Sequence, residues 1–429
     1  MSKKVSLGAT ITLMAMVAAV TVSVTVMYYQ NVFNGKMVNL TEREAMYSKL
    51  SELDRIARNN YIGEVDEENL TDYLARGYVA GLGDKYARYF DANGYEAYMQ
   101  ELEGRVVGIG VEASLDPSGY ILVGTVYADS PASINGIQEG DLIVKVDDID
   151  VNAETYQQAT DAIRGEEGTR VTLTVRRDNE DTEIPVTRRK VDIPTVFSRI
   201  IDGDVGYVRI SEFSDSTASQ FDKQVDTLIA QGATALIFDV RNNVGGTLTS
   251  VTAMLDKLLP QGNIVSATYK NGKTEVLATS DADEIALPMA VLTNGRTASA
   301  AELFTQALKD YGKAKSVGSL TYGKGSMQEV KKLNDGSAVN LTVATYYPPS
   351  GESYDGIGIK PDYEVQILAE LENNLTNLNE NTDPQLKKAL EVVLTAVRAE
   401  NNSSESAASG EAESGESSGS SEGASKEGE

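Results

Sequence analysis

The sequence predicts a mixed protein of several domains, α/β (α+β) in class. Three observations support this prediction. The chain has 429 residues, which is enough for about three domains. Its hydrophobic period is helical before Gln100 and changes to two after Gly104. From Ile200 onward, apolar strands alternate with amphipathic helices, which is the pattern of a layered α/β domain.

The composition excludes several classes of protein. The chain has no Cys, His or Trp, and 38 Lys and Arg against 64 Asp and Glu give a formal net charge of −26. Without Cys and His, thiolate chemistry, histidine-based catalysis and thiolate zinc sites are excluded. The negative charge argues against nucleic acid as a partner, because its phosphates would be repelled. We expect no cofactor and no metal, since the sequence contains no obvious ligand cluster.

The N-terminal segment predicts a transmembrane helix. Val5–Tyr29 is 25 residues without a charge, long enough at about 1.5 Å per residue to span a bilayer core. Lys3 and Lys4 precede it, so residues 1–31 are read as a cytoplasmic N-terminus and a cell-membrane anchor, with the rest extracytoplasmic. A cleaved signal peptide is the competing interpretation. The absence of Cys favours a bacterial envelope without disulfides, as in Gram-positive species.

The remaining chain divides by pattern. Residues 32–100 are predicted to be a helical lead-in, because apolar residues recur at helical spacing. Residues 101–189 read as a β-rich module with one main helix, and residues 190–366 as the α/β core. Residues 367–400 form a C-terminal helical region. Residues 401–429 have no aromatic or branched aliphatic side chain, so we predict a disordered acidic tail.

Two motifs in the β-rich module indicate peptide binding. The first consists of Val107, Gly108, Ile109 and Gly110. Backbone N–H groups at such a stretch can hold a carboxylate, and the following strand edge can pair with an extended peptide. Together, the first motif and a second one, Ser130–Asp147, resemble a PDZ domain, and this resemblance implies capture of peptide tails. Arg164 ends the one main helix, and either caps its C-terminus or places beside the groove a guanidinium that senses bound peptide.

Three fragments of the α/β core could carry chemistry. Ser299 opens a helix, and is either its cap in a Ser-x-x-Glu box with Glu302 or a nucleophile. Lys324 lies between two glycines. It is either an ordinary lysine of a turn or a base whose pKa is lowered by burial. Gly245 and Gly246 follow an apolar strand. They either form only a tight turn or supply backbone N–H groups that bind an oxyanion.

In their order along the chain, the fragments resemble the C-terminal processing peptidases, also called tail-specific serine proteases. The resemblance covers about residues 61–365, and Ser299, Lys324 and Gln328 have the spacing of that family. It implies that Ser299 is the nucleophile, Lys324 the general base and Gln328 the residue that orients the lysine. For the oxyanion donors we predict Gly245 or Gly246, together with Ala300.

The sequence thus predicts a membrane-anchored extracytoplasmic serine endopeptidase that cleaves proteins near their C-termini by a Ser-Lys mechanism. Its partner is a protein or peptide with an exposed C-terminus, which the PDZ domain captures, and peptide docking there gates activity in one version of this hypothesis. A homodimer and a regulatory protein partner are left open. The alternative is a catalytically silent, membrane-anchored PDZ scaffold. The presence of Ser299, Lys324 and Gln328 favours the protease.

Overall fold

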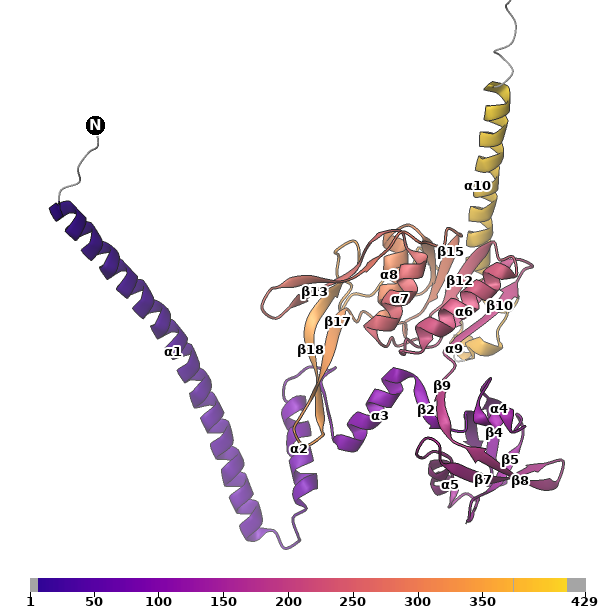
Figure 1. Cartoon of the computed structure of the whole chain (residues 1–429), viewed down its shortest axis with the longest axis horizontal. Helices are drawn as coiled ribbons and strands as arrows, with labels where there is room; N and C mark the ends of the chain where they lie inside the picture. Colours follow the sequence, from indigo (N-terminus) through magenta and orange to yellow (C-terminus); the bar gives the residue numbers. More distant parts are fainter. Residues whose placement is uncertain (1–6, 373, 415–429) are drawn as a thin grey trace, which may run out of the picture. The chain divides into compact units, whose positions relative to one another are not determined.

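The computed structural model describes residues 7–372 and 374–414. The chain divides into two compact units, Met1–Ala75 and Arg76–Glu429, and Figure 1 shows their elements coloured along the sequence. Helices and sheets both contribute, so the predicted mixed α/β class is confirmed.

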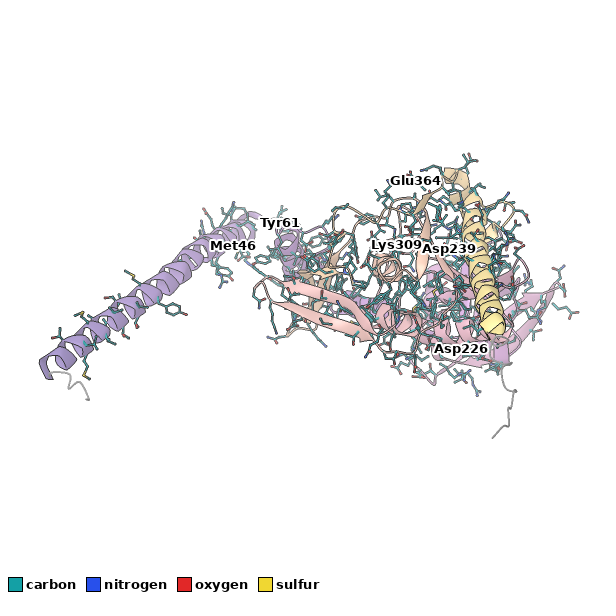
Figure 2. All side chains as sticks on the ribbon, turned by 90° about the horizontal axis from the view of Figure 1, so that it is seen from above. Met46, Tyr61, Asp226, Asp239, Lys309 and Glu364 are labelled. Atoms are coloured by element: carbon teal, nitrogen blue, oxygen red, sulfur yellow. The ribbon has the colours of Figure 1, made fainter. Side chains whose placement is uncertain are left out.

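The first unit contains the long helix α1 (Leu7–Asn60) and the beginning of α2 (Glu67–Ala80). Side chains of α1 such as Leu13 and Met16 are exposed, and Figure 2 shows side chains projecting along the length of this helix. The predicted anchor Val5–Tyr29 falls partly outside the described residues. Within the residues that are described, no helix meets the length and apolarity needed to cross a membrane.

The β-rich module is a sheet domain with its own core. Its elements are β2 (Arg105–Gly108), β3 (Val111–Leu115), β4 (Ile121–Val126), α4 (Pro131–Ile134), β5 (Leu142–Val146), β6 (Ile149–Asp150), α5 (Tyr156–Ile163), β7 (Arg170–Arg177), β8 (Glu180–Thr187) and β9 (Arg189–Asp192). The sheet has the order β3-β4-β5-β7-β8, with β6 paired to β5. Ile163 of α5 packs with Ile121 and Leu173 of the sheet. The antiparallel pair β2–β9 lies where the chain enters and leaves the module.

The α/β core is built on a six-stranded sheet in the order β10-β11-β12-β15-β16-β19. These strands are β10 (Val196–Ile201), β11 (Val205–Ile210), β12 (Ala235–Asp239), β15 (Met289–Thr293), β16 (Ala314–Gly318) and β19 (Tyr363–Glu364). Only the β10–β11 pair is antiparallel. Every residue of β12 and β15 is buried, as expected for parallel strands covered on both faces.

Helices cover both faces of this sheet. They are α6 (Thr217–Ala230), α7 (Leu248–Leu258), α8 (Ala300–Asp310) and α10 (Pro384–Ser414). Because side chains alternate along a strand, Leu236 and Phe238 of β12 join the cluster that contains α6, α7 and α8. Ile237 joins the opposite cluster, with Leu386 and Ala389 of α10. Along the chain, α7 follows β12 and α8 follows β15. The turns at the carboxyl ends of these two strands carry Gly245, Gly246 and Ser299 of the candidate site.

A second sheet has the order β1-β18-β13-β14, with β17 paired to β18. Its strands are β1 (Arg88–Phe90), β13 (Gly262–Tyr269), β14 (Thr274–Ser280), β17 (Ser326–Lys332) and β18 (Ala338–Tyr347). The strand β1 lies inside the stretch predicted to be helical, between α2 and α3 (Ala92–Glu103). Its Arg-Tyr-Phe sequence favours a strand because aromatic side chains pack well on a sheet, and β18 supplies the partner.

The C-terminal region differs from the prediction at its tail. After α9 (Ala369–Glu372) and the 3₁₀ turn η1 (Leu375–Asn377), α10 continues to Ser414. The prediction of disorder is therefore wrong for residues 401–414, while residues 415–429 lie outside the described range. Extending a helix adds residues without a new nucleation step, and this stretch contains Ala and Glu, which propagate helices well.

Candidate active site

The turn between β15 and α8 holds Ser299 in an unusual backbone conformation. Ser299 has φ 56° and ψ −118°, a combination that residues with a Cβ rarely adopt. Before it, the Thr297 hydroxyl donates to the Val240 carbonyl oxygen (2.8 Å) and accepts the Asn294 N–H (3.0 Å). These bonds fix the turn against the chain that leaves β12. Ser299 lines a pocket of about 430 Å³.

Glu302 is fully buried and connects the serine turn to the lysine loop. Its Oε2 accepts the N–H groups of Ser299 (2.9 Å) and Lys324 (2.7 Å). Its Oε1 accepts the N–H of Gly323 (2.6 Å) and the hydroxyl of Thr321 (2.5 Å). The sequence indicated Glu302 only as a member of a helix cap. Its four hydrogen bonds also hold the two candidate catalytic loops at a fixed separation, because charge-assisted bonds of this kind are strong.

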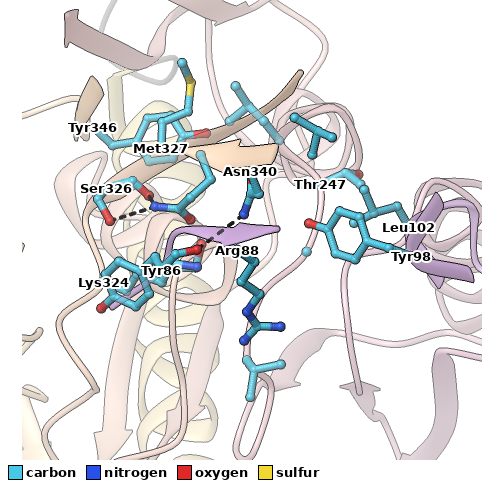
Figure 3. Close-up of a pocket in the computed structure, with 16 residues that line it drawn as sticks. Tyr86, Arg88, Tyr98, Leu102, Thr247, Lys324, Ser326, Met327, Asn340 and Tyr346 are labelled. Carbon is cyan, nitrogen blue, oxygen red and sulfur yellow. Dashed lines mark hydrogen bonds between the residues drawn. The ribbon is translucent and has the colours of Figure 1, made fainter. Parts of the chain in front are cut away.

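Lys324 is half-buried beside an aromatic ring. Its Nζ lies 4.7 Å from the centroid of the Tyr86 ring, and Figure 3 shows the Lys324 and Tyr86 side chains next to each other. Within the described part of the chain, none of the ion pairs formed by lysines includes Lys324. Burial lowers the pKa of Lys324, and the Arg88 guanidinium lowers it further, against the opposing charges of Asp84 and Glu302. Such a lysine is more readily neutral near pH 7, as a general base must be.

Gln328 lines the same pocket from β17. Its Nε2 donates to the hydroxyl groups of Ser326 (3.0 Å) and Thr342 (3.1 Å), and Figure 3 shows the first of these bonds. A β-bulge between Met327 and Gln328 shifts the pairing of β17 with β18. Since both donors of an amide lie on its nitrogen, the remaining Oε1 is the atom able to accept from Lys324.

The glycine turn after β12 lies against the nucleophile turn. A Cβ on Gly245 would lie 2.8 Å from the Ser299 Cβ and 3.0 Å from the Ala300 nitrogen. The Gly245 N–H donates to Asn243 Oδ1 (2.8 Å), so of the two predicted alternatives, Gly245 and Gly246, the first already has an acceptor for its N–H. In the described residues, no acceptor occupies the backbone N–H of Gly246 or Ala300. Ala300 is the first residue of α8, where N–H groups have no intrahelical partner.

The predicted peptide groove forms a separate pocket of about 320 Å³ in the PDZ-like module. It is lined by all five residues that the sequence indicated, namely Val107, Gly108, Ile109, Gly110 and Arg164. Gly110 has φ 80°, and a Cβ there would lie 2.4 Å from the Ser130 Cβ, so this turn requires glycine. Arg164 is the C-cap residue of α5 and is exposed where it lines the groove.

A buried ion-pair network at the end of β12 was missed from the sequence. Arg241 donates to Asp239 through Nε (2.9 Å) and NH2 (2.5 Å), and its NH1 lies 2.8 Å from Asp383. The Tyr207 hydroxyl donates to Asp239 (2.7 Å). Burial alone would raise the pKa of Asp239, but Arg241 and Tyr207 hold it below its usual value. The network anchors the start of α10 to the chain that leads into the glycine turn. Among the described residues, no cluster of acidic side chains is suited to a metal ion.

Comparison with known proteins identifies the family. The model of peptidase family S41 matches residues 204–365, and a PDZ domain model matches residues 122–177. The carboxy-terminal processing protease CtpA of Bacillus subtilis (strain 168) is 31% identical over 326 residues, which are 76% of this chain and 70% of that protein. The chain belongs to peptidase family S41. A probable CtpA-like serine protease of Staphylococcus aureus (strain N315) is 30% identical over 398 residues, 90% of this chain and 79% of the relative.

Ser299, Lys324 and Gln328 all lie inside the S41 match. The expectation of a C-terminal processing serine peptidase with a PDZ domain is confirmed. The solved structure of the photosystem II D1 C-terminal processing protease is 28% identical to this S41 peptidase, covering 73% of this chain and 86% of that chain with a TM-score of 0.44.

Proposed function

We propose that this S41 peptidase cleaves protein substrates near their C-termini with Ser299 as nucleophile and Lys324 as general base. The observation that supports this most directly is one pocket containing both side chains. In it, Ser299 stands on a strained turn and Lys324 has a lowered pKa. Strain and shifted pKa values concentrate at functional sites.

The proposed reaction needs only groups of this chain and one water molecule. Neutral Lys324 takes the proton of the Ser299 hydroxyl as its oxygen attacks the peptide carbonyl carbon. The N–H groups of Gly246 and Ala300 bind the oxyanion that forms. The Lys324 ammonium then protonates the leaving amine as the peptide bond breaks. Water gives a proton to Lys324, and its hydroxide oxygen releases the acyl group from Ser299, which regains its proton.

Gln328 has a positioning role in this proposal. Its Nε2 is held by Ser326 and Thr342, which leaves Oε1 as the acceptor for the Lys324 amine. A single accepted hydrogen bond aims the lone pair of a neutral lysine without adding charge that would raise its pKa.

The PDZ groove is proposed to capture the substrate tail. The pocket bounded by Val107–Gly110 and α5 supplies backbone N–H groups and an exposed guanidinium, Arg164, beside a strand edge. A terminal carboxylate and an extended backbone have the complementary groups. Binding there would raise the local concentration of the tail at the active-site pocket.

We also propose that the chain is anchored in the cell membrane, with its catalytic part outside the cytoplasm. The support is the uncharged stretch Val5–Tyr29 after Lys3 and Lys4. The full chain should sediment with membranes, resist extraction by alkaline carbonate and be released by detergent. Recovery in the soluble fraction, or a mature N-terminus beyond Tyr29, would contradict an uncleaved anchor.

The test of the proteolytic function uses the full chain in detergent with casein as substrate. We expect the parent to cut casein and a serine-directed fluorophosphonate to label Ser299, as located by mass spectrometry. Ser299→Ala should lose both signals, with a fall in rate of at least about 10³-fold. Ser319→Ala is the matched control, since Ser319 is not among the residues lining the pocket. Casein cleavage that survives Ser299→Ala would refute the assignment.

A further inference from the structure

Arg88 is a cation at the active-site pocket that the proposed mechanism does not use. It is the first residue of β1 and is exposed, and its side chain lines the pocket together with Ser299 and Lys324. Within the described chain, its guanidinium has neither an ion pair nor a hydrogen bond, whereas Arg176, Arg177 and Arg241 each bind a carboxylate. A guanidinium offers five donors in a planar fork.

The sheet register directs Arg88 toward the reacting groups. Arg88 pairs with Asn340 of β18, and Asn340 pairs with Val330 of β17. Residues directly opposite one another across strands share a face, and all three line the pocket. Figure 3 shows the Arg88 side chain extending from β1 between the Tyr86 and Lys324 side and the Tyr98 side of the pocket. The influence of Arg88 on the pKa of Lys324 is a second sign of proximity.

The charge of the pocket is the opposite of that of the whole protein. The chain carries a formal charge of −26, yet no Asp or Glu is among the described residues that line the pocket. When Lys324 is neutral, as its role as base requires, Arg88 is the remaining formal charge on the lining. The rings of Tyr86 and Tyr98 and the side chain of Leu102 also line it and reduce the access of water, which strengthens the attraction of an anion to Arg88.

We propose that Arg88 is a specificity-determining residue that binds a carboxylate of the substrate in the active-site pocket. This inference rests on the proposed proteolytic function of the same pocket. Two sources have the required chemistry: an Asp or Glu side chain near the scissile bond, and the α-carboxylate of the tail being removed. Either would form a charge-assisted, two-pronged bond with the guanidinium. The protein would then select acidic or freshly exposed tails despite its own negative field.

The experiment compares matched peptides on the full chain. One set replaces Glu by Gln at each of the three positions on either side of the cleaved bond, and another compares a free C-terminus with an amide. We expect the parent to prefer the carboxylate form by about tenfold in kcat/KM at one position. Arg88→Gln should lower that ratio about tenfold relative to the parent, and Arg88→Lys should restore part of it, because Lys keeps the charge without the fork.

The control variant is Lys85→Gln. Lys85 lies over the same Tyr86 ring, 4.7 Å from its centroid, and like Arg88 it lowers the pKa of Lys324, but it does not line the pocket. It should leave the carboxylate preference unchanged. The ratio is used because an effect on the base changes both peptides of a pair equally. Loss of the Glu preference alone identifies a side-chain carboxylate, and loss of the free-acid preference alone identifies the α-carboxylate.

The same peptide pairs are then compared by the ratio of their dissociation constants in proteins that carry Ser299→Ala, with and without the Arg88 substitution. In this way low turnover in an Arg88 variant does not hide selectivity. The contribution of the PDZ groove cancels between variants, since Arg88 is not among the residues that line it. Equal ratios in the parent and Arg88→Gln would overturn the proposal while leaving the proteolytic function intact. A parent that cuts neither casein nor any peptide would instead refute the proposed function, and this inference with it.

Discussion

Replacing Lys324 by Ala is expected to lower kcat/KM by at least about 10³-fold, because it removes the only proposed base for the Ser299 hydroxyl. Lys324→Arg should be nearly as inactive. An Arg side chain keeps the positive charge but does not deprotonate in a protein, so it cannot accept the proton. Activity is measured with a fluorogenic peptide, and folding is checked by thermal denaturation.

The matched control is Lys331→Ala, which removes a lysine from the neighbouring strand β17. Lys331 is exposed, pairs with Glu329 and does not line the pocket. We expect its activity to stay within a factor of about two of the parent, since exposed ion pairs contribute little. A folded Lys324→Arg variant with activity near that of the parent would show that this side chain is not the base.

The pH dependence of the parent should carry the signature of the lysine. Burial, and secondarily Arg88, lower the pKa of Lys324, and only its neutral form can take a proton. The rate should therefore rise with pH through the pKa of Lys324. This rise should come below the ordinary lysine value of about 10.4. In Lys324→Ala the residual rate should lose this limb of the profile.

The strand β12 and the ion pairs of Arg241 differ in whether the sequence predicts them, and the difference depends on whether a feature leaves a local sequence pattern. The strand is predicted because its apolar residues are adjacent in the sequence. Ser299, Lys324 and Gln328 are predicted because their spacing resembles that of the family. The partner of Arg241 is Asp383, which lies in a different region of the chain. Such a pair leaves no local pattern, since only the folded sheet and α10 bring its members together.

The same limit applies to β1 and to the glycine turn. Arg88 lies within residues 32–100, which the sequence predicts to be helical, and only pairing with β18 makes it part of a strand and directs it to the pocket. Gly245 and Gly246 are equivalent as sequence, but Asn243 Oδ1 takes the N–H of Gly245 alone. For residues 401–414, the prediction of disorder rested on composition and did not include the helix that already precedes them in α10. In each case a neighbour in space, or a preceding turn of helix, decides the outcome.

Replacing Glu302 by Gln is expected to lower kcat by about 10²-fold with a smaller change in KM. The amide nitrogen would replace one of two acceptor oxygens, so two of the four donors, from Ser299, Lys324, Gly323 and Thr321, would face a donor instead. Each unpaired buried donor costs about 1–3 kcal/mol. The two loops would move apart slightly, and small misplacement of a nucleophile and its base is costly.

The pH profile separates this positioning role from simple destabilisation. Burial lowers the pKa of Lys324, and the charge of Glu302 partly offsets that shift. Removing the charge in Glu302→Gln should therefore move the rising limb of the profile to lower pH, while Arg88→Gln should move it to higher pH. Thr321→Val removes one donor and leaves the carboxylate charged, so its limb should stay in place. A Glu302→Gln variant that loses stability but keeps the parental kcat and pH limb would show that Glu302 only caps α8.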